Sequence, residues 1–184
     1  MRGVLNLTRA GLLIAASVVL TRFAGVMIPL AGVLALRLSF GDVPIILAGL
    51  FLGPTWGAVV GVSADLLGFA LNPMGGPFFP GFTLTAALVG VLPSLFLRVF
   101  SAGRSDKPGF WRYLAAIACS DLITSVILNT YWLHLMYGKA ILALLPPRII
   151  ARAVLVPVFA GLVTLTTNAL SLPVPALARV TKKG

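Results

Sequence analysis

Two charged residues of this chain, Asp65 and Arg22, lie inside long apolar runs. A carboxylate inside a membrane span costs about 2.5–3.5 kcal/mol on insertion scales, so Asp65 is expected to face an interior or a wet cavity and to have a partner. That partner is a group on a neighbouring helix, a ligand donor or a transferred proton. Arg22 either snorkels to the surface or presents its flat guanidinium to a ring and a carboxylate. Both residues are predicted to bind a ligand.

Two more cations stand at the start of the last apolar run. Arg148 and Arg152 are four residues apart, so they share one helical face. Without acids beside them, two cations on one face suit an anion. Asp42 stands at the entrance of a run, where an acid is an ordinary helix cap. Asp121 lies nearer the middle of another run, where a structural role is favoured. Arg148 and Arg152 are therefore predicted binding residues, and the two acids are not.

The segment NPMGGPFFPG, residues 72–81, has no charge and places three prolines and three glycines around paired aromatics. Proline fixes φ and glycine permits tight turns, so this loop is predicted to be rigid and to cover a pocket near Asp65. A simple apolar turn at the membrane interface is the alternative. The predicted ligand contacts here are Asn72, Pro73, Phe78, Phe79 and Pro80. Asn129 and Trp132 join them from a later run, although an aromatic belt also explains Trp132.

The elements that position these residues are predicted to be transmembrane helices. Hydrophobic residues make up 59% of the chain and charged ones 10%, and the mean hydropathy is +1.07. An ordinary soluble domain has about 25% charged residues, so this is a polytopic membrane protein. The net charge of +10 does not indicate nucleic-acid binding, because the basic residues cluster where apolar runs end instead of forming a stripe. They indicate topology and contact with anionic lipid.

We predict a single all-α transmembrane domain with about six helices and both termini in the cytoplasm. The run at 43–71 is too long for one span of a hydrocarbon core about 30 Å thick, and Pro54 interrupts it. With six spans the basic residues obey the positive-inside rule, whereas a single bent span at this point would leave five. The predicted spans are 10–30, 40–53, 54–71, 82–100, 113–135 and 149–170. The extracellular loops are then 31–41, 72–81 and 136–147.

Small residues recur every four positions on two predicted helices, as Gly53, Gly57 and Gly61 and as Gly11 and Ala15. Such faces permit close helix contact, either inside the protein or against another membrane subunit. The second reading matters because the chain has no phosphate-binding G-x-x-x-x-G-K-[ST] loop and no G-x-S-x-G motif. A single His and no Glu leave no metal constellation, and lone Cys119 cannot form an intrachain disulfide. No catalytic residue, metal or cofactor is expected.

The segments RLSFGDVPIILAGLFLGP, GVSADLLGF and LNPMGGPFFPGFTLTAAL resemble the folate-specific substrate-binding S components of energy-coupling factor (ECF) vitamin transporters. The rest of the chain agrees in span count and orientation. The resemblance implies a six-helix bundle in the bacterial cell membrane that captures a vitamin with high affinity. It also implies delivery through a transmembrane coupling subunit and two ATPase subunits. Gly11 and Ala15 are the nearest match to the family's coupling-subunit contact, and Gly53, Gly57 and Gly61 are further candidates.

Folate chemistry suits the predicted residues. Its pterin has an amidine-like donor edge that Asp65 can accept from, and its flat rings can stack on Phe78, Phe79 or Arg22. Its glutamate tail needs cations, for which the candidates are Arg37, Arg148 and Arg152. Other S-component ligands remain open, namely pantothenate, a queuosine precursor or thiamine, although three arginines disfavour cationic thiamine. A stand-alone proton-coupled carrier using Asp65 and Asp121 also remains open, and a membrane enzyme is a weaker alternative.

Overall fold

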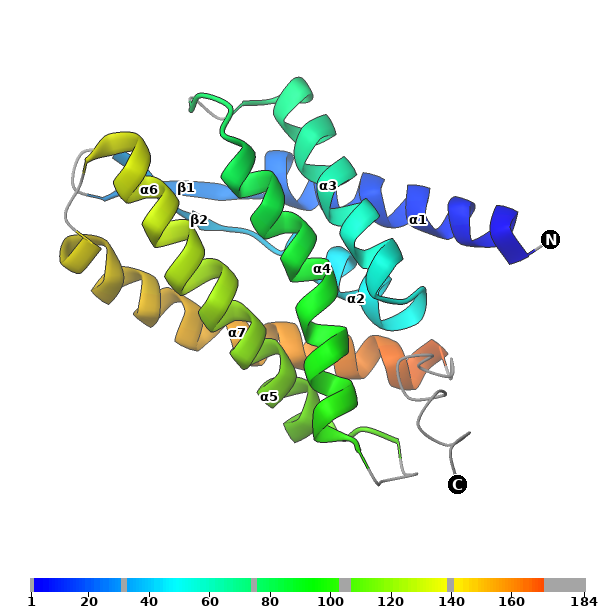
Figure 1. Ribbon diagram of the computed structural model, residues 1–184. Helices are drawn as coiled ribbons and strands as arrows, with labels where there is room; N and C mark the ends of the chain where they lie inside the picture. Colours follow the sequence, from blue (N-terminus) through cyan, green and yellow to red (C-terminus); the bar gives the residue numbers. More distant parts are fainter. Residues whose placement is uncertain (1, 31–32, 74–75, 103–106, 139–140, 171–184) are drawn as a thin grey trace.

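A computed structural model describes residues 2–30, 33–73, 76–102, 107–138 and 141–170, apart from the side chains of residues 2, 26–30, 33–38, 143, 144 and 170. The elements are, in order, α1 (Arg2–Val18), η1 (Val19–Phe23), β1 (Val26–Leu30), β2 (Val33–Leu38), α2 (Asp42–Phe51), α3 (Pro54–Leu71), α4 (Pro80–Phe100), α5 (Phe110–Asp121), η2 (Leu122–Leu128), α6 (Asn129–Tyr137) and α7 (Ile141–Leu170). The segments η1 and η2 are π-helical. Figure 1 shows the helices crossing one another in a single bundle.

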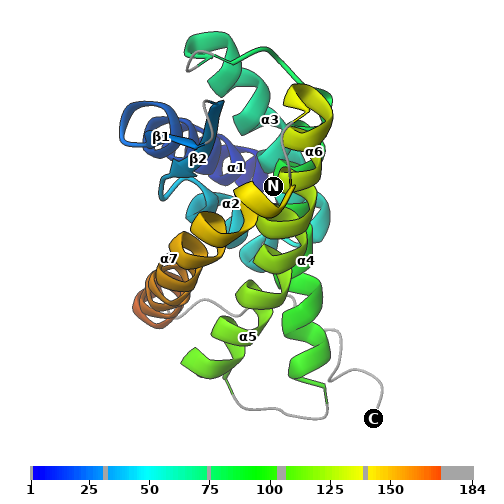
Figure 2. The same cartoon turned by 90° about the vertical axis from the view of Figure 1, so that its left-hand side faces the viewer.

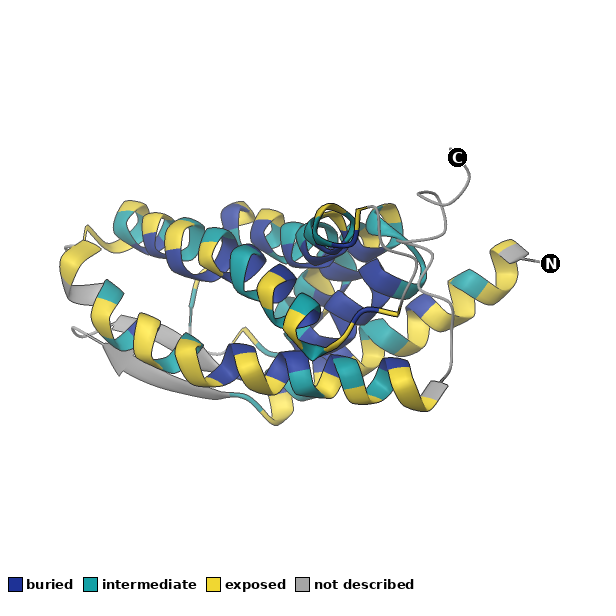
Figure 3. Ribbon diagram, turned by 90° about the horizontal axis from the view of Figure 1, so that it is seen from below, coloured by how far each residue is buried: buried dark blue, intermediate teal, exposed yellow. Residues whose placement is uncertain are grey.

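The all-α class is confirmed, since helices make up the body of the bundle. Five of them are long and apolar enough to cross a membrane: Gly3–Phe23, Pro54–Leu71, Pro80–Phe100, Phe110–Tyr137 and Leu145–Ala169. The fourth consists of α5, η2 and α6 in succession. Large apolar residues of these helices, such as Leu67, Val99 and Val154, are exposed. Figure 3 shows exposed positions along the outer sides of the helices. In a bilayer these faces contact lipid, so their exposure is expected.

The first helix begins and ends earlier than the predicted span of residues 10–30. It ends with η1 at Phe23, and residues 26–30 and 33–38 pair as an antiparallel hairpin in place of the predicted helix end and loop. The pairing runs from Val26 opposite Leu38 to Leu30 opposite Val33, with a register shift between Ile28 and Pro29. Pro29 lacks an amide hydrogen, and β-branched residues favour extended backbone, so this stretch is a poor helix. The hairpin is the one sheet among the described residues.

Helix α2 is the centre of the packing. All of its residues from Val43 to Leu50 are buried, and it contacts α1, α3, α4 and α7. Figure 2 shows α2 enclosed among these helices. Its 10 residues span about 15 Å, half of a bilayer core. The predicted second span is therefore a buried half-span, which turns into α3 at Gly53, where φ is 103°.

Glycines let α2, α3 and α4 approach one another closely. A Cβ at Gly49 or Gly57 would collide with the carbonyl oxygen of Gly90, and one at Gly90 would collide with that of Gly57. A Cβ at Gly61 would meet the Ala86 carbonyl on α4 in the same way. Small residues at such crossings allow backbones to touch. Gly57 and Gly61 therefore serve internal packing, and the prediction that they face a coupling subunit is wrong.

Helix α1 begins and α7 ends at the same end of the molecule (Figures 1 and 3). This arrangement agrees with both termini on one side of the membrane, and their cytoplasmic placement remains a prediction. Helix α7 starts at Ile141, before the predicted start at 149, and accommodates Pro146, Pro147 and Pro157. Gly11 and Ala15 lie on exposed positions of α1, with no atom within 4 Å of a Cβ at Gly11. Their contact with a coupling subunit remains a prediction.

The crossing of α2, α3 and α4 at Gly49, Gly57 and Gly90 gives a test of packing. Gly90→Ala should lower stability by about 1–3 kcal/mol, because its methyl group must displace the α3 backbone. Gly161→Ala on α7 is the matched control, since its Cβ would have no neighbour within 4 Å. The measurement is the thermal midpoint of the detergent-solubilised chain by fluorescence-detected gel filtration. Equal midpoints for the two variants would contradict the close crossing.

Candidate ligand-binding site

A cavity of about 180 Å³ lies in the bundle and gathers residues from elements far apart in the sequence. Four groups line it: Ser17, Thr21, Arg22, Asp42 and Ile45 from the first third of the chain; Ala64, Asp65 and Phe69 from α3, with Pro73, Gly76, Pro77, Phe78 and Phe79 after it; Phe82, Thr85, Ala86 and Val89 from α4; and Ser125, Asn129, Leu133, Met136, Tyr137, Arg148 and Arg152. Aromatic walls with a few charged groups are typical of small-molecule sites. The cavity joins residues predicted separately from the sequence.

One set of charged and polar groups, here called the Arg22 cluster, consists of Arg22, Asp65, Asn72 and Thr83. Arg22 Nη2 lies 3.5 Å from Asp65 Oδ1, and the Thr83 hydroxyl donates to Asp65 Oδ2 at 2.7 Å. Arg22 Nη1 donates to the Asn72 carbonyl at 3.0 Å, while the Asn72 amide donates to the Arg22 carbonyl at 3.2 Å. Asp65 thus has partners within the protein and also lines the cavity. It fits both the structural role and the ligand-binding role expected from the sequence.

Gly68 makes the Arg22 cluster possible. A Cβ at this position on α3 would lie 2.8 Å from Arg22 Nε, so the absence of a side chain admits the guanidinium. Arg22 itself is in η1, where the Ala24 amide bonds back to the Val19 carbonyl. π-helical turns are frequent at functional sites because they alter where side chains point. The snorkelling alternative for Arg22 is wrong, since this residue is buried.

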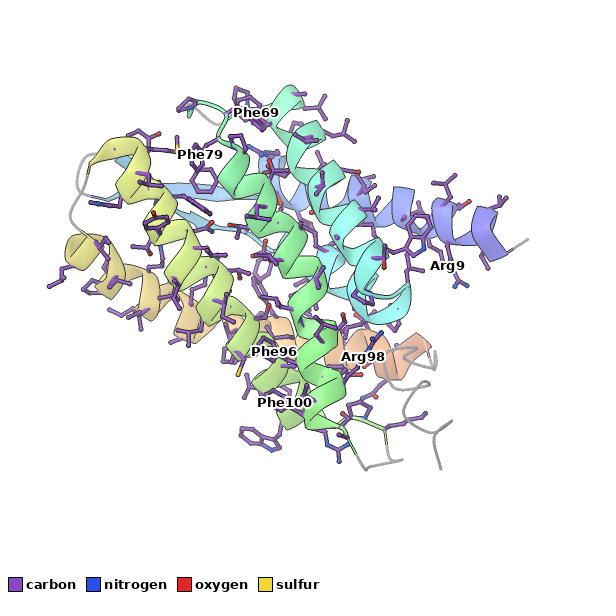
Figure 4. All side chains as sticks on the ribbon, viewed as in Figure 1. Arg9, Phe69, Phe79, Phe96, Arg98 and Phe100 are labelled. Carbon is purple, nitrogen blue, oxygen red and sulfur yellow. The ribbon has the colours of Figure 1, made fainter. Side chains whose placement is uncertain are left out.

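Aromatic rings form one wall of the cavity. Phe78 packs against Phe69 with ring centroids 5.3 Å apart, and Phe79 packs against Phe82 and Trp132 at 5.8 and 5.6 Å. Figure 4 shows Phe69 and Phe79 near one end of the bundle, away from Arg9 and Arg98.

Trp132 supports this wall from behind Phe79. Its Nε1 donates to the Thr85 hydroxyl at 3.1 Å, which fixes the indole ring. A Cβ at Gly81 would strike the Phe79 ring, so glycine leaves space for it. Pro80 begins α4 and is exposed.

A second set, here called the Arg152 cluster, consists of Arg152, Asp42 and Asp121. Arg152 Nη1 lies 3.3 Å from Asp42 Oδ2 and 3.1 Å from Asp121 Oδ1. The expectation of two cations without neighbouring acids is therefore wrong for Arg152. Its acidic partners come from α2 and α5 and become neighbours only through folding. Asp42 also lines the cavity, although the sequence suggested only a helix cap.

Arg148 is held differently. Its Nη1 donates to the Ser125 carbonyl at 2.9 Å, within η2. In an α-helix the Asn129 amide would bond to Ser125, but here it bonds to the Thr124 carbonyl. The π-helical spacing therefore leaves the Ser125 carbonyl available to Arg148. Asn129 also lines the cavity, and its buried Oδ1 accepts no hydrogen bond from the described residues, so it can accept one from a ligand donor.

The structure adds residues that sequence reasoning missed. Ser17, Thr21, Phe69, Phe82, Thr85, Ser125 and Tyr137 line the cavity, and Thr83 binds Asp65. Hydroxyl and aromatic residues are ordinary in a span, so they gave no separate signal. Of the predicted residues, Arg37 lies on β2, and its side chain is outside the described part of the chain. The described residues contain no group of three or more His, Cys, Asp or Glu that can hold a metal.

Comparison with known proteins agrees with this architecture. The family model described as "ECF transporter, substrate-specific component" matches residues 5–173. The chain therefore belongs to the substrate-specific components of ECF transporters, and it is a multi-pass membrane protein. The sequence resemblance to S components is thereby confirmed.

Among individual relatives, the chain is similar to folate transporters named FolT. It is 30% identical to the one from Clostridium novyi, over 80% of this chain and 79% of that protein. It is 32% identical to the one from Leuconostoc mesenteroides, over 71% and 70%. A crystal structure of FolT bound with folic acid matches with a TM-score of 0.74 and 29% identity, over 91% of this chain and 95% of the other. The S component of a bacterial ECF transporter matches with a TM-score of 0.64 and 26% identity, over 90% and 96%.

The Arg152 cluster gives a test that needs no ligand. Arg152→Met should destabilise the chain by about 3–5 kcal/mol, because the buried carboxylate of Asp121 and the partly buried carboxylate of Asp42 lose their cation. The triple variant with Asp42→Asn and Asp121→Asn should recover most of the loss. Arg9→Met, which changes an exposed arginine on α1, is the control. Thermal midpoints in detergent report the outcome, and an Arg152→Met midpoint equal to that of Arg9→Met would contradict the cluster.

Proposed function

We propose that this chain is the high-affinity folate-binding subunit of an ECF transporter in the bacterial cell membrane. It captures folate or a reduced folate on the outer side and delivers it through a complex with a transmembrane coupling subunit and two ATPase subunits. The chain itself catalyses no reaction and needs no cofactor. ATP hydrolysis takes place on the partner subunits.

The observation that carries this proposal is the meeting of three kinds of group in one cavity. Asp65 can accept hydrogen bonds from the donor edge of the pterin while Thr83 and Arg22 hold the carboxylate in place. Phe78 and Phe79 offer ring faces for stacking. Arg148 supplies a cation for the glutamate tail. The similarity to FolT proteins of two bacteria supports the same ligand.

The location of the Arg22 cluster supports a pterin at that end of the cavity. The guanidinium of Arg22 is fixed by the Asn72 carbonyl at 3.0 Å, so it is already oriented before a ligand enters. A preorganised site loses less entropy on binding, which favours high affinity. Thiamine, a cation, would be repelled by the guanidinium of Arg148, which also lines the cavity, whereas the folate tail is an anion that this guanidinium attracts. Folate therefore suits the charges better than thiamine does.

The first experiment is calorimetric titration of the purified, detergent-solubilised chain without partners. We expect tight one-to-one binding of folate and 5-formyl-tetrahydrofolate, and no heat of binding with thiamine or pantothenate. Uptake by this chain alone in proteoliposomes is the companion measurement, and no accumulation is expected without the partner subunits. Binding of pantothenate or thiamine in place of folates would contradict the ligand. Uptake by the isolated chain driven by a proton gradient would favour the stand-alone carrier.

Two variants separate the ends of the ligand. Asp65→Asn should lower the binding affinity for folate and for pteroate, which lacks the glutamate tail, by roughly ten- to a hundredfold in each case. Each ligand loses a charge-assisted hydrogen bond from its pterin. Arg148→Ala should weaken folate by a similar factor and pteroate by much less. Arg9→Ala is the control for an arginine on an exposed position. If both site variants bind folate with the affinity of the Arg9→Ala protein, this division of roles is wrong.

A further inference from the structure

The Arg152 cluster combines one cation with two anions at the edge of the ligand cavity. Arg152 bridges Asp42 and Asp121 through the same nitrogen, at 3.3 and 3.1 Å. Its local charge is therefore negative, not positive. Arg152 and Asp42 line the ligand cavity, whereas Asp121 lines a separate small cavity of about 10 Å³ that also touches Asp42. The three side chains are only 10–19% exposed, so solvent screens them weakly.

These positions matter for an anionic ligand. A carboxylate that approaches Arg152 from the cavity must also approach the Asp42 carboxylate, and repulsion offsets the attraction. Arg148 stands one helical turn away, and its Nη1 hydrogen bond goes to the uncharged Ser125 carbonyl. Arg152 already has two carboxylate oxygens at 3.3 and 3.1 Å, so a ligand carboxylate meets more direct repulsion at Arg152 than at Arg148. The two arginines look equivalent in the sequence but differ in the structure.

We propose that Asp42 is a specificity-determining residue that limits the cavity to one ligand carboxylate. By binding Arg152, it leaves Arg148 as the cation for that carboxylate, and it keeps the second carboxylate of a glutamate tail outside the cavity, in water. This inference rests on the proposed folate ligand. According to this inference, Asp42 determines how many ligand carboxylates the cavity accepts. Arg148 binds the ligand carboxylate, and Arg152 binds Asp42.

The test uses ligands of the same shape that differ by one charge. Folate and its two monoamides, in which either the α- or the γ-carboxylate is a carboxamide, are titrated into the wild-type chain. We expect one monoamide to bind about tenfold or more weakly than folate, because it loses the contact with Arg148. The other monoamide should bind within about threefold of folate, because its altered group remains in water. Tenfold loss with both monoamides would overturn the proposal, and so would the absence of loss with either.

Variants then assign the effect to Asp42. In Asp42→Asn the cavity face of Arg152 is no longer opposed, so the second carboxylate should be drawn in. The monoamide that was tolerated should now bind about tenfold more weakly than folate. Asp121→Asn is the matched control, since it removes the same charge from the same cluster but keeps Asp42 at the cavity. Its ratio of folate to monoamide affinities should stay within about threefold of the wild-type ratio.

The outcomes separate the inference from the proposed function. If Asp42→Asn and Asp121→Asn both weaken all three ligands by one common factor, the cluster is only a structural support and the inference is overturned. If the wild-type chain binds no folate at all, the proposed ligand is wrong and the inference falls with it. The wild-type monoamide comparison needs no variant, so poor folding of Asp42→Asn does not remove the test.

Discussion

Charge in a low-dielectric interior must be balanced, and much of this structure follows from that constraint. An unpaired ion inside a membrane bundle is costly, and its partner must come from the protein or from a ligand. The described interior meets this demand in two places, where Arg22 pairs with Asp65 and where Arg152 lies between Asp42 and Asp121. Each place ties together segments distant in the sequence. The same contacts that neutralise charge therefore hold the walls of the cavity together.

Close approach of the backbones is the second requirement. A half-span such as α2 leaves its polar ends inside the bundle, and it is stable only when neighbouring helices enclose it. Gly49, Gly57 and Gly90 let α2, α3 and α4 meet without side chains between them. This crossing holds α2 and α3 in place, and these two helices carry Asp42 and Asp65, which line the cavity. Small residues thus position charged residues, although they carry no chemistry themselves.

The sequence predicted the membrane class, the all-α fold and the family, because these depend on composition, on the lengths of apolar runs and on contiguous motifs. Pro73, Phe78 and Phe79, which line the cavity, were predicted for the same reason, since proline, glycine and aromatic residues stand together in that segment. The partners of Arg152 were not predicted, because Asp42 is 110 positions away and ion pairing across such a separation depends on the fold.

The hairpin after η1 was missed as well. Hydropathy over residues 10–30 does not distinguish an apolar strand from an apolar helix, and Pro29 was the signal that could have ended the helix earlier. The function of Gly57 was similarly ambiguous, because a small-residue face looks the same whether the neighbouring helix belongs to this chain or to another. Sequence spacing shows which residues share a face, while only the packed structure shows what lies opposite.

The π-helical segment η2 has a consequence for how such a cavity can change over evolution. Over the same number of turns, this π-helical segment contains about one residue more than an α-helix would. If η2 returned to α-helical spacing by losing that residue, α6 would rotate about its axis by about 100°. Leu133, Met136 and Tyr137 would then leave the cavity together, although none of them had been replaced. A single-residue deletion in residues 122–128 is thus a route to a new ligand, reached by rotating one wall rather than by substituting it residue by residue.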